Sequence, residues 1–241
     1  MIPLRDLNPT RTFPFFTVLI IIANALVFLY ELVLQGTSQR AIDAFYEFYG
    51  FIPCVITDGC PRIAVALQTA HDPVSPVASL FTSMFVHGGW LHIAGNMLFF
   101  WIFGNNVEDM MGHFRFLIFY FVCGLIAAFA QIGFDPTSAI PSLGASGAIA
   151  GVLGAYFVSY PRAPVDTAIF ALFVFFVRLP AWVVLGVWIV LQFFTGVASL
   201  GTHDTGGVAT FAHIGGFLAG MLLVFLFRRR PPPRSSLPRV V

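Results

Sequence analysis

The chain has 241 residues, of which 58% are hydrophobic and only 10% are charged. Ordinary soluble domains carry about 25% charged residues, so this composition excludes a soluble fold and indicates an integral membrane protein. The net charge is +1, and all twelve cations are Arg, five of them in the C-terminal tail.

Six apolar windows are long enough to cross a bilayer, because a spanning helix needs about 20 mostly apolar residues. The windows cover residues 13–34, 80–105, 116–134, 143–160, 181–200 and 208–227. A seventh apolar piece, residues 167–177, is too short to span, so we expect it to lie at the membrane interface or to extend the fifth helix. The sequence thus predicts an all-α membrane domain of six transmembrane helices over 13–227, between a polar N-terminal segment at 1–12 and an Arg- and Pro-rich tail at 228–241.

The arginines predict the orientation of these six spans. Most of them fall on one side of the membrane if the spans alternate, and the positive-inside rule makes that side cytoplasmic. They are Arg5, Arg11, Arg115, Arg162 and Arg178, with Arg228, Arg229, Arg230, Arg234 and Arg239 in the tail. Only Arg40 and Arg62 lie opposite. We therefore expect both termini in the cytoplasm, an outer loop at about 35–77, and a tail that is a topological anchor and not a nucleic-acid site.

The outer loop is rich in aromatic residues between Phe45 and Phe51, so we expect it to be partly embedded in the membrane. Cys54 and Cys60 lie in the same loop. An oxidising compartment would permit a disulfide between them, but two free thiols fit the sequence equally well. Cys123 lies within the third span and is most simply a packing residue.

Polar side chains gather in the N-terminal parts of the second, fourth and sixth spans, which alternation places in the same leaflet. Such side chains are costly in a membrane and tend to face the protein interior or a wet cavity. They are His92, Asn96, Ser146 and His213.

Ser146 lies in Gly144-Ala145-Ser146-Gly147 at the start of the fourth span. Gly and Ser are common helix-packing residues in membranes, which is the structural alternative. A serine at a helix N-terminus, however, has free backbone N–H groups and the positive end of the helix dipole beside its hydroxyl. Both would stabilise an oxyanion formed on attack, so Ser146 is a candidate nucleophile.

His213 lies near the start of the sixth span, and glycines on its helix face and on the fourth span would admit close backbone approach. We assign this packing to Gly144, Gly147, Gly151 and Gly154 on one side and Gly216 and Gly220 on the other. Tight packing would bring the imidazole within hydrogen-bond reach of Ser146, as a general base requires. No Asp or Glu lies mid-span in either helix, so the pattern predicts a Ser-His dyad and not a triad. The structural alternative is that His213 only forms a hydrogen bond between helices.

His92 and Asn96 are four residues apart and therefore share one helix face. Both can donate hydrogen bonds, so together with the Ser146 N–H they could hold a developing oxyanion. A purely structural pair is the alternative.

The residues resemble the rhomboid family, specifically its bacterial-type six-span members. Three motifs over about residues 81–227 carry this resemblance: His92-x3-Asn96, Gly144-x-Ser146-Gly147 and Ala212-His213-x2-Gly216-x3-Gly220. Their order on spans two, four and six is what makes the resemblance specific.

The resemblance implies an intramembrane serine protease with Ser146 as nucleophile, His213 as general base, and His92 with Asn96 as the oxyanion-stabilising pair. It also implies a structural or gating role for Glu108, for which a solvated loop carboxylate is the plain alternative. Transmembrane protein substrates, membrane lipids as surroundings, and a bacterial plasma (inner) membrane follow from it. We expect no metal or other cofactor, and the sequence leaves the oligomeric state open.

Two positions depart from the family pattern. Ala150 lies one turn after the serine, where some members place a Tyr against the histidine, so the base must be oriented by another group. The Trp-Arg pair found in the outer loop of many members is not evident.

Three other functions compete with the protease. A non-catalytic rhomboid-like protein that binds membrane clients would typically lack the serine or the histidine, and both are present. A transporter or channel would favour internal repeats, of which the chain has no convincing example. A metalloprotease would need His-Glu-x2-His or clustered Cys and His ligands, which the sequence lacks.

Overall fold

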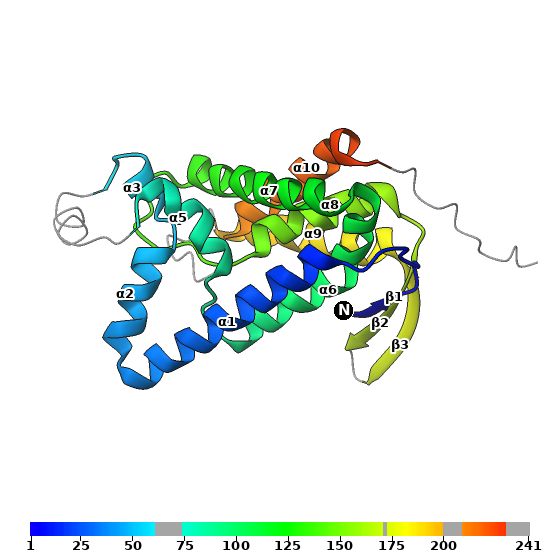
Figure 1. Ribbon diagram of the computed structural model, residues 1–241, viewed down its shortest axis with the longest axis horizontal. Helices are drawn as coiled ribbons and strands as arrows, with labels where there is room; N and C mark the ends of the chain where they lie inside the picture. The colour runs from blue at the N-terminus through cyan, green and yellow to red at the C-terminus, as the bar shows by residue number, and fades with distance from the viewer. Residues whose placement is uncertain (61–73, 171–172, 200–208, 230–241) are drawn as a thin grey trace, which may run out of the picture.

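The apolar segments of the chain form helices that pack side by side, and a small sheet lies across one end of the helices (Figure 1). The computed structural model describes residues 1–60, 74–170, 173–199 and 209–229. The described helices are α1 (Phe15–Thr37), α2 (Gln39–Tyr49), α3 (Pro53–Ile56), α5 (Pro76–Thr82), the 3-10 helix η1 (Ser83–Phe85), α6 (Trp90–Met111), α7 (His113–Phe134), α8 (Ser146–Ser159), α9 (Ala181–Ser199) and α10 (Thr210–Phe227). The strands are β1 (Ile2–Asp6), β2 (Pro164–Phe170) and β3 (Val174–Pro180).

Four helices in the described part of the chain are long and apolar enough to cross a membrane: α1, α7, α9 and α10. The predicted second and fourth spans correspond to α6 and α8, which do not meet this criterion. α6 has 22 residues but carries polar groups near both ends, and α8 has only 14 residues. At 1.5 Å per residue α8 is roughly 21 Å long, less than the roughly 30 Å of a bilayer core. The protein is therefore a multi-pass membrane protein with at least four candidate spans.

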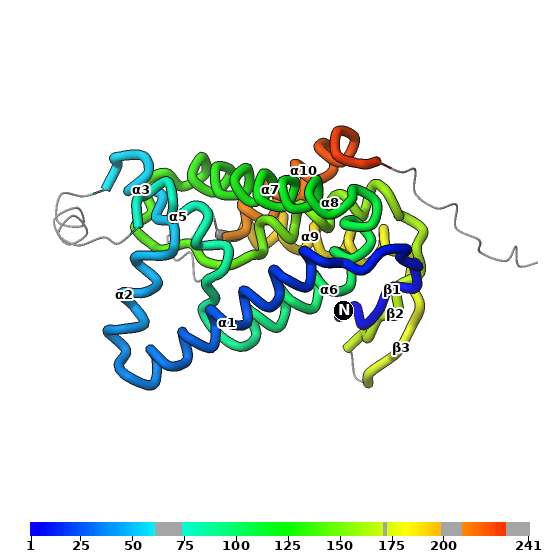
Figure 2. The backbone as a smooth tube through the Cα atoms, viewed as in Figure 1, coloured from blue at the N-terminus to red at the C-terminus, as the bar shows by residue number. Residues whose placement is uncertain are grey.

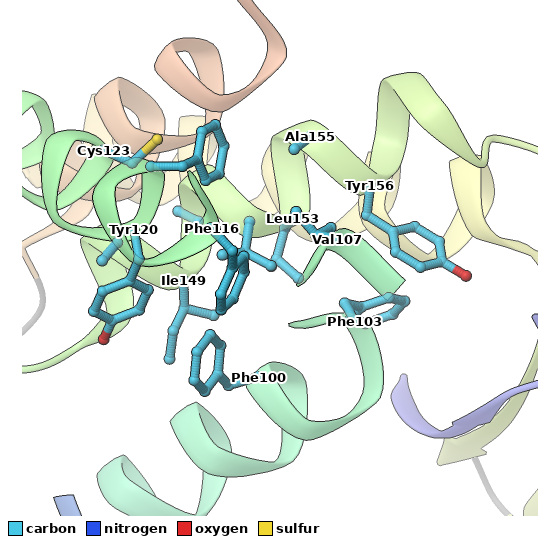
Figure 3. Packing of buried hydrophobic residues seen from close by; sticks show 14 of the residues in the cluster. Phe100, Phe103, Val107, Phe116, Tyr120, Cys123, Ile149, Leu153, Ala155 and Tyr156 are labelled. Carbon is cyan, nitrogen blue, oxygen red and sulfur yellow. The ribbon is translucent and has the colours of Figure 1, made fainter. Parts of the chain in front are cut away.

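The short helix α8 lies at the centre of the bundle. All residues from Gly147 to Tyr156 are buried, mainly against α10, α7 and α6. Figure 3 shows Ile149 and Leu153 of α8 among Phe100 and Phe103 of α6 and Phe116 of α7. A helix covered on all sides by protein needs no lipid-facing surface, which explains how a 14-residue segment is kept at membrane depth.

The predicted second span is interrupted, so its predicted start at residue 80 is wrong. The chain turns at His87-Gly88-Gly89, and α6 begins only at Trp90 and continues to Met111. Gly89 has φ +154°, which L side chains rarely adopt, so this glycine permits the break between η1 and α6.

The seventh apolar piece forms a β-hairpin, so its prediction as an extension of the fifth helix is wrong. β2 and β3 pair antiparallel, and β1 from the N-terminal segment pairs antiparallel with β2. The backbone trace shows the first residues of the chain beside this hairpin (Figure 2). The hairpin is rich in Phe and Val, which suit a pleated surface, and β3 ends at Pro180 before α9 begins. Its location at a membrane interface stays a prediction.

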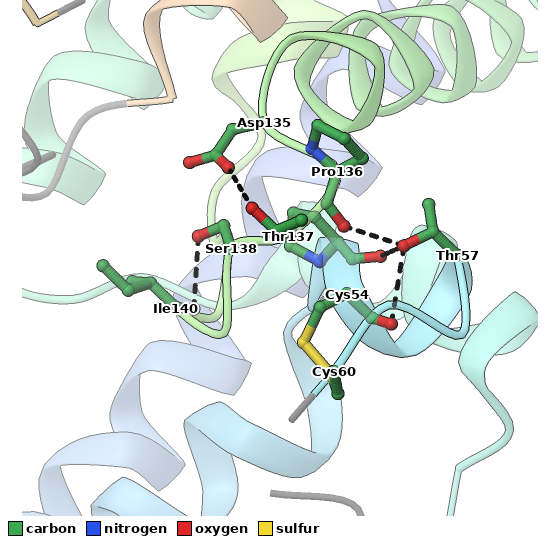
Figure 4. Close-up of a disulfide and its surroundings, with 9 residues drawn as sticks. Cys54, Thr57, Cys60, Asp135, Pro136, Thr137, Ser138 and Ile140 are labelled. Atoms are coloured by element: carbon green, nitrogen blue, oxygen red, sulfur yellow. Dashed lines mark hydrogen bonds between the residues drawn. A yellow bond between two sulfur atoms is a disulfide. The ribbon is translucent and has the colours of Figure 1, made fainter. Parts of the chain in front are cut away.

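Cys54 and Cys60 form a disulfide beside the loop that follows α7 (Figure 4). The Thr57 hydroxyl donates to the Pro136 carbonyl oxygen over 2.7 Å, so the disulfide loop is attached to the bundle. Cys123 is buried within the core, as predicted. Residues 61–73 of the predicted outer loop, which include Arg62, and residues 230–241 of the tail, which include Arg230, Arg234 and Arg239, lie outside the described residues.

Candidate active site

Ser146 is the first residue of α8, so its hydroxyl lies at a helix N-terminus. The loop before it is held by the Gly144 N–H, which donates to the Ser83 carbonyl oxygen over 2.9 Å. Gly144 has φ +116°, a conformation that a residue with a Cβ rarely adopts. The first N–H groups of an α-helix have no partner within the helix, so those of α8 lie unpaired by the helix itself at the end that carries Ser146.

His213 lies in the first turn of α10, and its Nε2 is 2.6 Å from the Ser146 Oγ. Only 8% of His213 is exposed, whereas Ser146 is half-buried, so most of the imidazole surface is covered by protein. The two residues are 67 positions apart in the sequence and come together only because α8 and α10 cross.

Glycine backbones make this crossing close. A Cβ at Gly216 would overlap the carbonyl of Gly147, and a Cβ at Gly220 would overlap the carbonyl of Gly151. Gly154 likewise lies against the backbone of α10. Gly144, which the sequence analysis grouped with these residues, lies in the loop before α8 and does not pack two helices together. Its role is to leave space, because a Cβ there would be 2.6 Å from the His92 Nε2.

The other nitrogen of the His213 ring has a partner that sequence reasoning missed. Gln192 of α9 lies with its Oε1 2.7 Å from the His213 Nδ1. The Trp188 ring, one turn earlier on α9, lies 5.8 Å from the imidazole centroid. Ala150 is buried in α8 and brings no aromatic ring to this position. The polar signal that would have identified Gln192 is its presence inside an otherwise apolar span.

His92 and Asn96 lie on α6 on the other side of Gly144. The Nδ2 of Asn96 is 3.6 Å from the Cβ position of Gly144, so both side chains face the loop that leads to Ser146. Asn96 is 8% exposed. Its amide nitrogen also donates to the His87 Nε2 over 3.0 Å, which fixes the amide orientation.

His87 is itself held by groups from two further helices, and these too were missed. Its backbone N–H donates to the Glu31 Oε1 of α1 over 3.0 Å, and its carbonyl accepts from the Tyr46 hydroxyl over 3.4 Å. Its ring Nδ1–H donates to the Phe85 carbonyl, which leaves Nε2 as the acceptor for Asn96. Glu31 is an acid within an apolar span, a pattern that marks a functional candidate in a membrane protein.

A cavity of about 680 Å³ joins these groups. Its lining includes His92 and Asn96 on α6, Ser146 on α8, Trp188 on α9 and His213 on α10. The Ser146 hydroxyl and the His213 imidazole therefore border an open space instead of being enclosed by packed side chains.

Glu108 lies outside this cluster and is fully buried, so its interpretation as a solvated loop carboxylate is wrong. It is part of α6, which continues for three residues beyond it to Met111, where the sequence predicted a loop. The carboxylate accepts from the backbone N–H groups of Phe16 and Thr17 at the start of α1, from the Thr17 hydroxyl, and from the His113 ring. These contacts fit a structural role, because they fix the N-terminus of α1 to α6; a gating role stays a prediction.

Comparison with known proteins identifies one family. A family model described as "Rhomboid domain" matches residues 75–230, about two thirds of the chain. The chain is 28% identical over 229 residues to "RHOMBOID-like protein 4" of Arabidopsis thaliana, covering 91% of this chain and 54% of that protein. It is 45% identical over 76 residues to "Rhomboid protease GluP" of Bacillus subtilis, covering 32% of this chain and 14% of that protein.

A third relative is "Rhomboid protein 1, mitochondrial" of Saccharomyces cerevisiae, 30% identical over 155 residues, with 63% of this chain and 42% of that protein covered. The chain thus spans about half, or less, of the length of these curated relatives. Because they come from a plant, a bacterium and a mitochondrion, they do not support the assignment to a bacterial plasma membrane.

Proposed function

Because the chain belongs to the rhomboid family, we propose that it is an intramembrane serine endopeptidase that cleaves transmembrane segments of other membrane proteins. The observation that carries the proposal is the 2.6 Å separation of the Ser146 Oγ and the His213 Nε2. A hydroxyl within hydrogen-bond reach of an imidazole is the arrangement that nucleophilic catalysis needs.

In the proposed reaction the Ser146 Oγ attacks the scissile carbonyl carbon while the His213 Nε2 accepts the hydroxyl proton. The tetrahedral intermediate collapses, the C–N bond breaks, and His213 gives the proton to the leaving amine. Water then attacks the acyl-enzyme ester with His213 again as base, which releases the acid product and restores the Ser146 hydroxyl.

Charge that develops on the carbonyl oxygen has three candidate donors. They are the Asn96 Nδ2 and the His92 ring, which lie near the Cβ position of Gly144, and the backbone N–H of Ser146, two residues later in the chain. Removing one such donor costs roughly 10²- to 10³-fold in kcat in other serine proteases, so this group is worth several kcal/mol of transition-state stabilisation.

The substrate class follows from the setting of the site. A peptide bond within an intact helix is shielded by side chains and committed to helical hydrogen bonding, so the substrate segment must unwind to enter the cavity. Helix-weakening Gly or Pro in the substrate should therefore favour cleavage, with a small residue before the scissile bond. We further propose six spans with both termini in the cytoplasm.

The test compares Ser146→Ala and His213→Ala with the parent protein in proteoliposomes that contain a fluorescently labelled single-span substrate. We expect both variants to lose at least about 10³-fold in cleavage rate. Ser159→Ala is the matched control, because it removes a hydroxyl from the other end of α8. Parental cleavage by Ser146→Ala would overturn the nucleophile assignment.

A serine-reactive fluorophosphonate separates the protease from a family member that only binds clients. If the chain is a protease, the reagent should label Ser146 covalently in the parent protein and should not label it in His213→Ala. A protein that captures the substrate but is neither labelled nor able to cleave it would be a client-binding member of the family.

A further inference from the structure

The hydrogen bond between Gln192 and His213 carries an inference that rests on the proposed protease function. We propose that Gln192 is the positioning residue of the general base, so that the orientation of His213 depends on the position of α9. The ring is then held at both nitrogens, by Ser146 at Nε2 and by Gln192 at Nδ1.

The chemistry of the amide oxygen selects one form of the ring. The Gln192 Oε1 is only a hydrogen-bond acceptor, so the group 2.7 Å from it must be a donor, and Nδ1 carries the proton. A neutral imidazole has a single N–H, so Nε2 is left with its lone pair directed at the Ser146 hydroxyl. This is the form that a general base requires, and the opposite tautomer would have no lone pair to accept the serine proton.

A neutral partner also fits the place of the site in the membrane. When His213 takes the serine proton, its Nδ1–H still donates to the Gln192 oxygen, whose dipole stabilises the new positive charge. An Asp or Glu in the same position would have to be kept ionised beside a ring that is only 8% exposed, and the ion would lose much of its hydration there. An amide supplies the orientation without a buried ion.

α9 differs from the two helices that carry Ser146 and His213. Its first half is buried through Ala181, Val184 and Leu185. Its second half exposes Val190 (51%), Phe193 (56%) and Phe194 (65%), on the turns that flank Gln192. The inner side of this half reaches α10 at Gly196, where a Cβ would lie 3.2 Å from Thr210. An outward shift of this half would therefore separate Gln192 from His213 and leave the glycine-packed pair on α8 and α10 in place.

The first experiment changes the acceptor. Gln192→Leu should lower kcat by about 10- to 100-fold and change KM less than about 2-fold, because the His213 ring loses its preferred tautomer but keeps its substrate contacts. The expected loss is smaller than the roughly 10⁴-fold that follows loss of the charged carboxylate partner in a serine protease. Gln192→Glu keeps a carboxyl oxygen that can accept from the Nδ1–H, and in its protonated form it adds no buried charge, so it should recover most of the rate. Nitrogen-15 NMR of His213 should show Nδ1–H in the parent and a tautomer mixture in Gln192→Leu.

The second experiment displaces α9 without touching the reacting groups. Gly196→Leu inserts a side chain between α9 and α10, and we expect it to reproduce both the kcat loss and the tautomer mixture of Gln192→Leu. Because the two changes act through one hydrogen bond, the double variant should lose no more than either single variant. Thr195→Leu is the matched control, since the neighbouring Thr195 is exposed and lies about 100° from Gly196 around the helix.

The outcomes separate the two proposals. Parental kcat and an intact Nδ1–H signal in Gln192→Leu, with Ser146→Ala inactive, would overturn the positioning role and leave the protease. Additive losses of kcat in the double variant, or a parental kcat in Gly196→Leu, would overturn the dependence of His213 orientation on the position of α9. Parental cleavage by Ser146→Ala would overturn the proposed function itself.

Discussion

Gly144 lies in the loop before Ser146, next to the His92 ring, in a backbone conformation with φ +116°. An added Cβ would be strained by this dihedral and would also lie 2.6 Å from the His92 Nε2. The same position thus controls the shape of the loop before Ser146 and the space where the substrate carbonyl oxygen would lie.

We expect Gly144→Ala to lower the cleavage rate by at least about 10-fold, because the loop must shift away from His92 and Asn96, the side chains proposed to stabilise the oxyanion. Gly133→Ala on α7 is the control, since a Cβ there meets nothing within 4 Å. Cleavage assays and thermal unfolding of both variants in the same detergent check this. Equal rates for Gly144→Ala and the parent would contradict the placement of the oxyanion beside this glycine.

Among the elements, the three-stranded sheet is attached to the helices by a half-buried carboxylate. Asp6 at the end of β1 accepts from the Tyr156 hydroxyl and from the Asn106 Nδ2, each over 2.8 Å. Burial raises the pKa of Asp6 from 3.8 to about 6, and the Tyr156 hydrogen bond opposes this shift. The protonated form therefore favours the docked strand.

The attachment of β1 should accordingly depend on pH. A carboxyl whose pKa is raised by folding contributes its stability fully below its unfolded pKa of 3.8 and loses it as the pH rises through about 6. The shift corresponds to roughly 3 kcal/mol at most. Amide hydrogen exchange of β1 in the parent should accelerate across this window relative to Asp6→Asn, which does not titrate. The same pH dependence of β1 exchange in the parent and in Asp6→Asn would show that titration of Asp6 does not cause the effect.

At the scale of the whole molecule, the direction of each span decides whether the polar groups share a leaflet. Ser146 and His213 start α8 and α10, and His92 and Asn96 belong to the first two turns of α6. The N-terminal ends of these three helices meet at the cavity, so the three helices run in the same direction. Helices α7 and α9 connect them in the opposite direction, which agrees with an alternating path through a membrane.

The proposed orientation predicts that both termini are on one side and the α1–α2 turn on the other. In sealed right-side-out vesicles, a membrane-impermeant maleimide should label Gly36→Cys, at the exposed end of α1, but not Leu4→Cys in β1 until the vesicles are opened. The buried Cys123 and the disulfide-bonded Cys54 and Cys60 should contribute little background. Labelling of both positions before opening would refute the predicted topology.

The sequence by itself determined the membrane class, the family resemblance that the domain match confirms, and the approximate positions of the helices. These depend on composition, on apolar runs and on short motifs, which are local properties of the chain. It also identified Ser146 and His213 as a possible pair, because glycines at helical spacing accompany both. It did not predict the hairpin, since an eleven-residue apolar run fits a strand pair as well as a short helix.

Only the tertiary structure decided which polar groups meet. Gln192 lies 21 positions from His213, and Glu31 lies 56 positions from His87, so no local pattern links either pair. The sequence is compatible with Glu108 as a solvated loop carboxylate. It is buried because α6 continues past it and the start of α1 packs against it. The physical reason is the same in each case: a hydrogen bond requires atoms within about 3 Å in a fixed direction, and this depends on how whole helices cross.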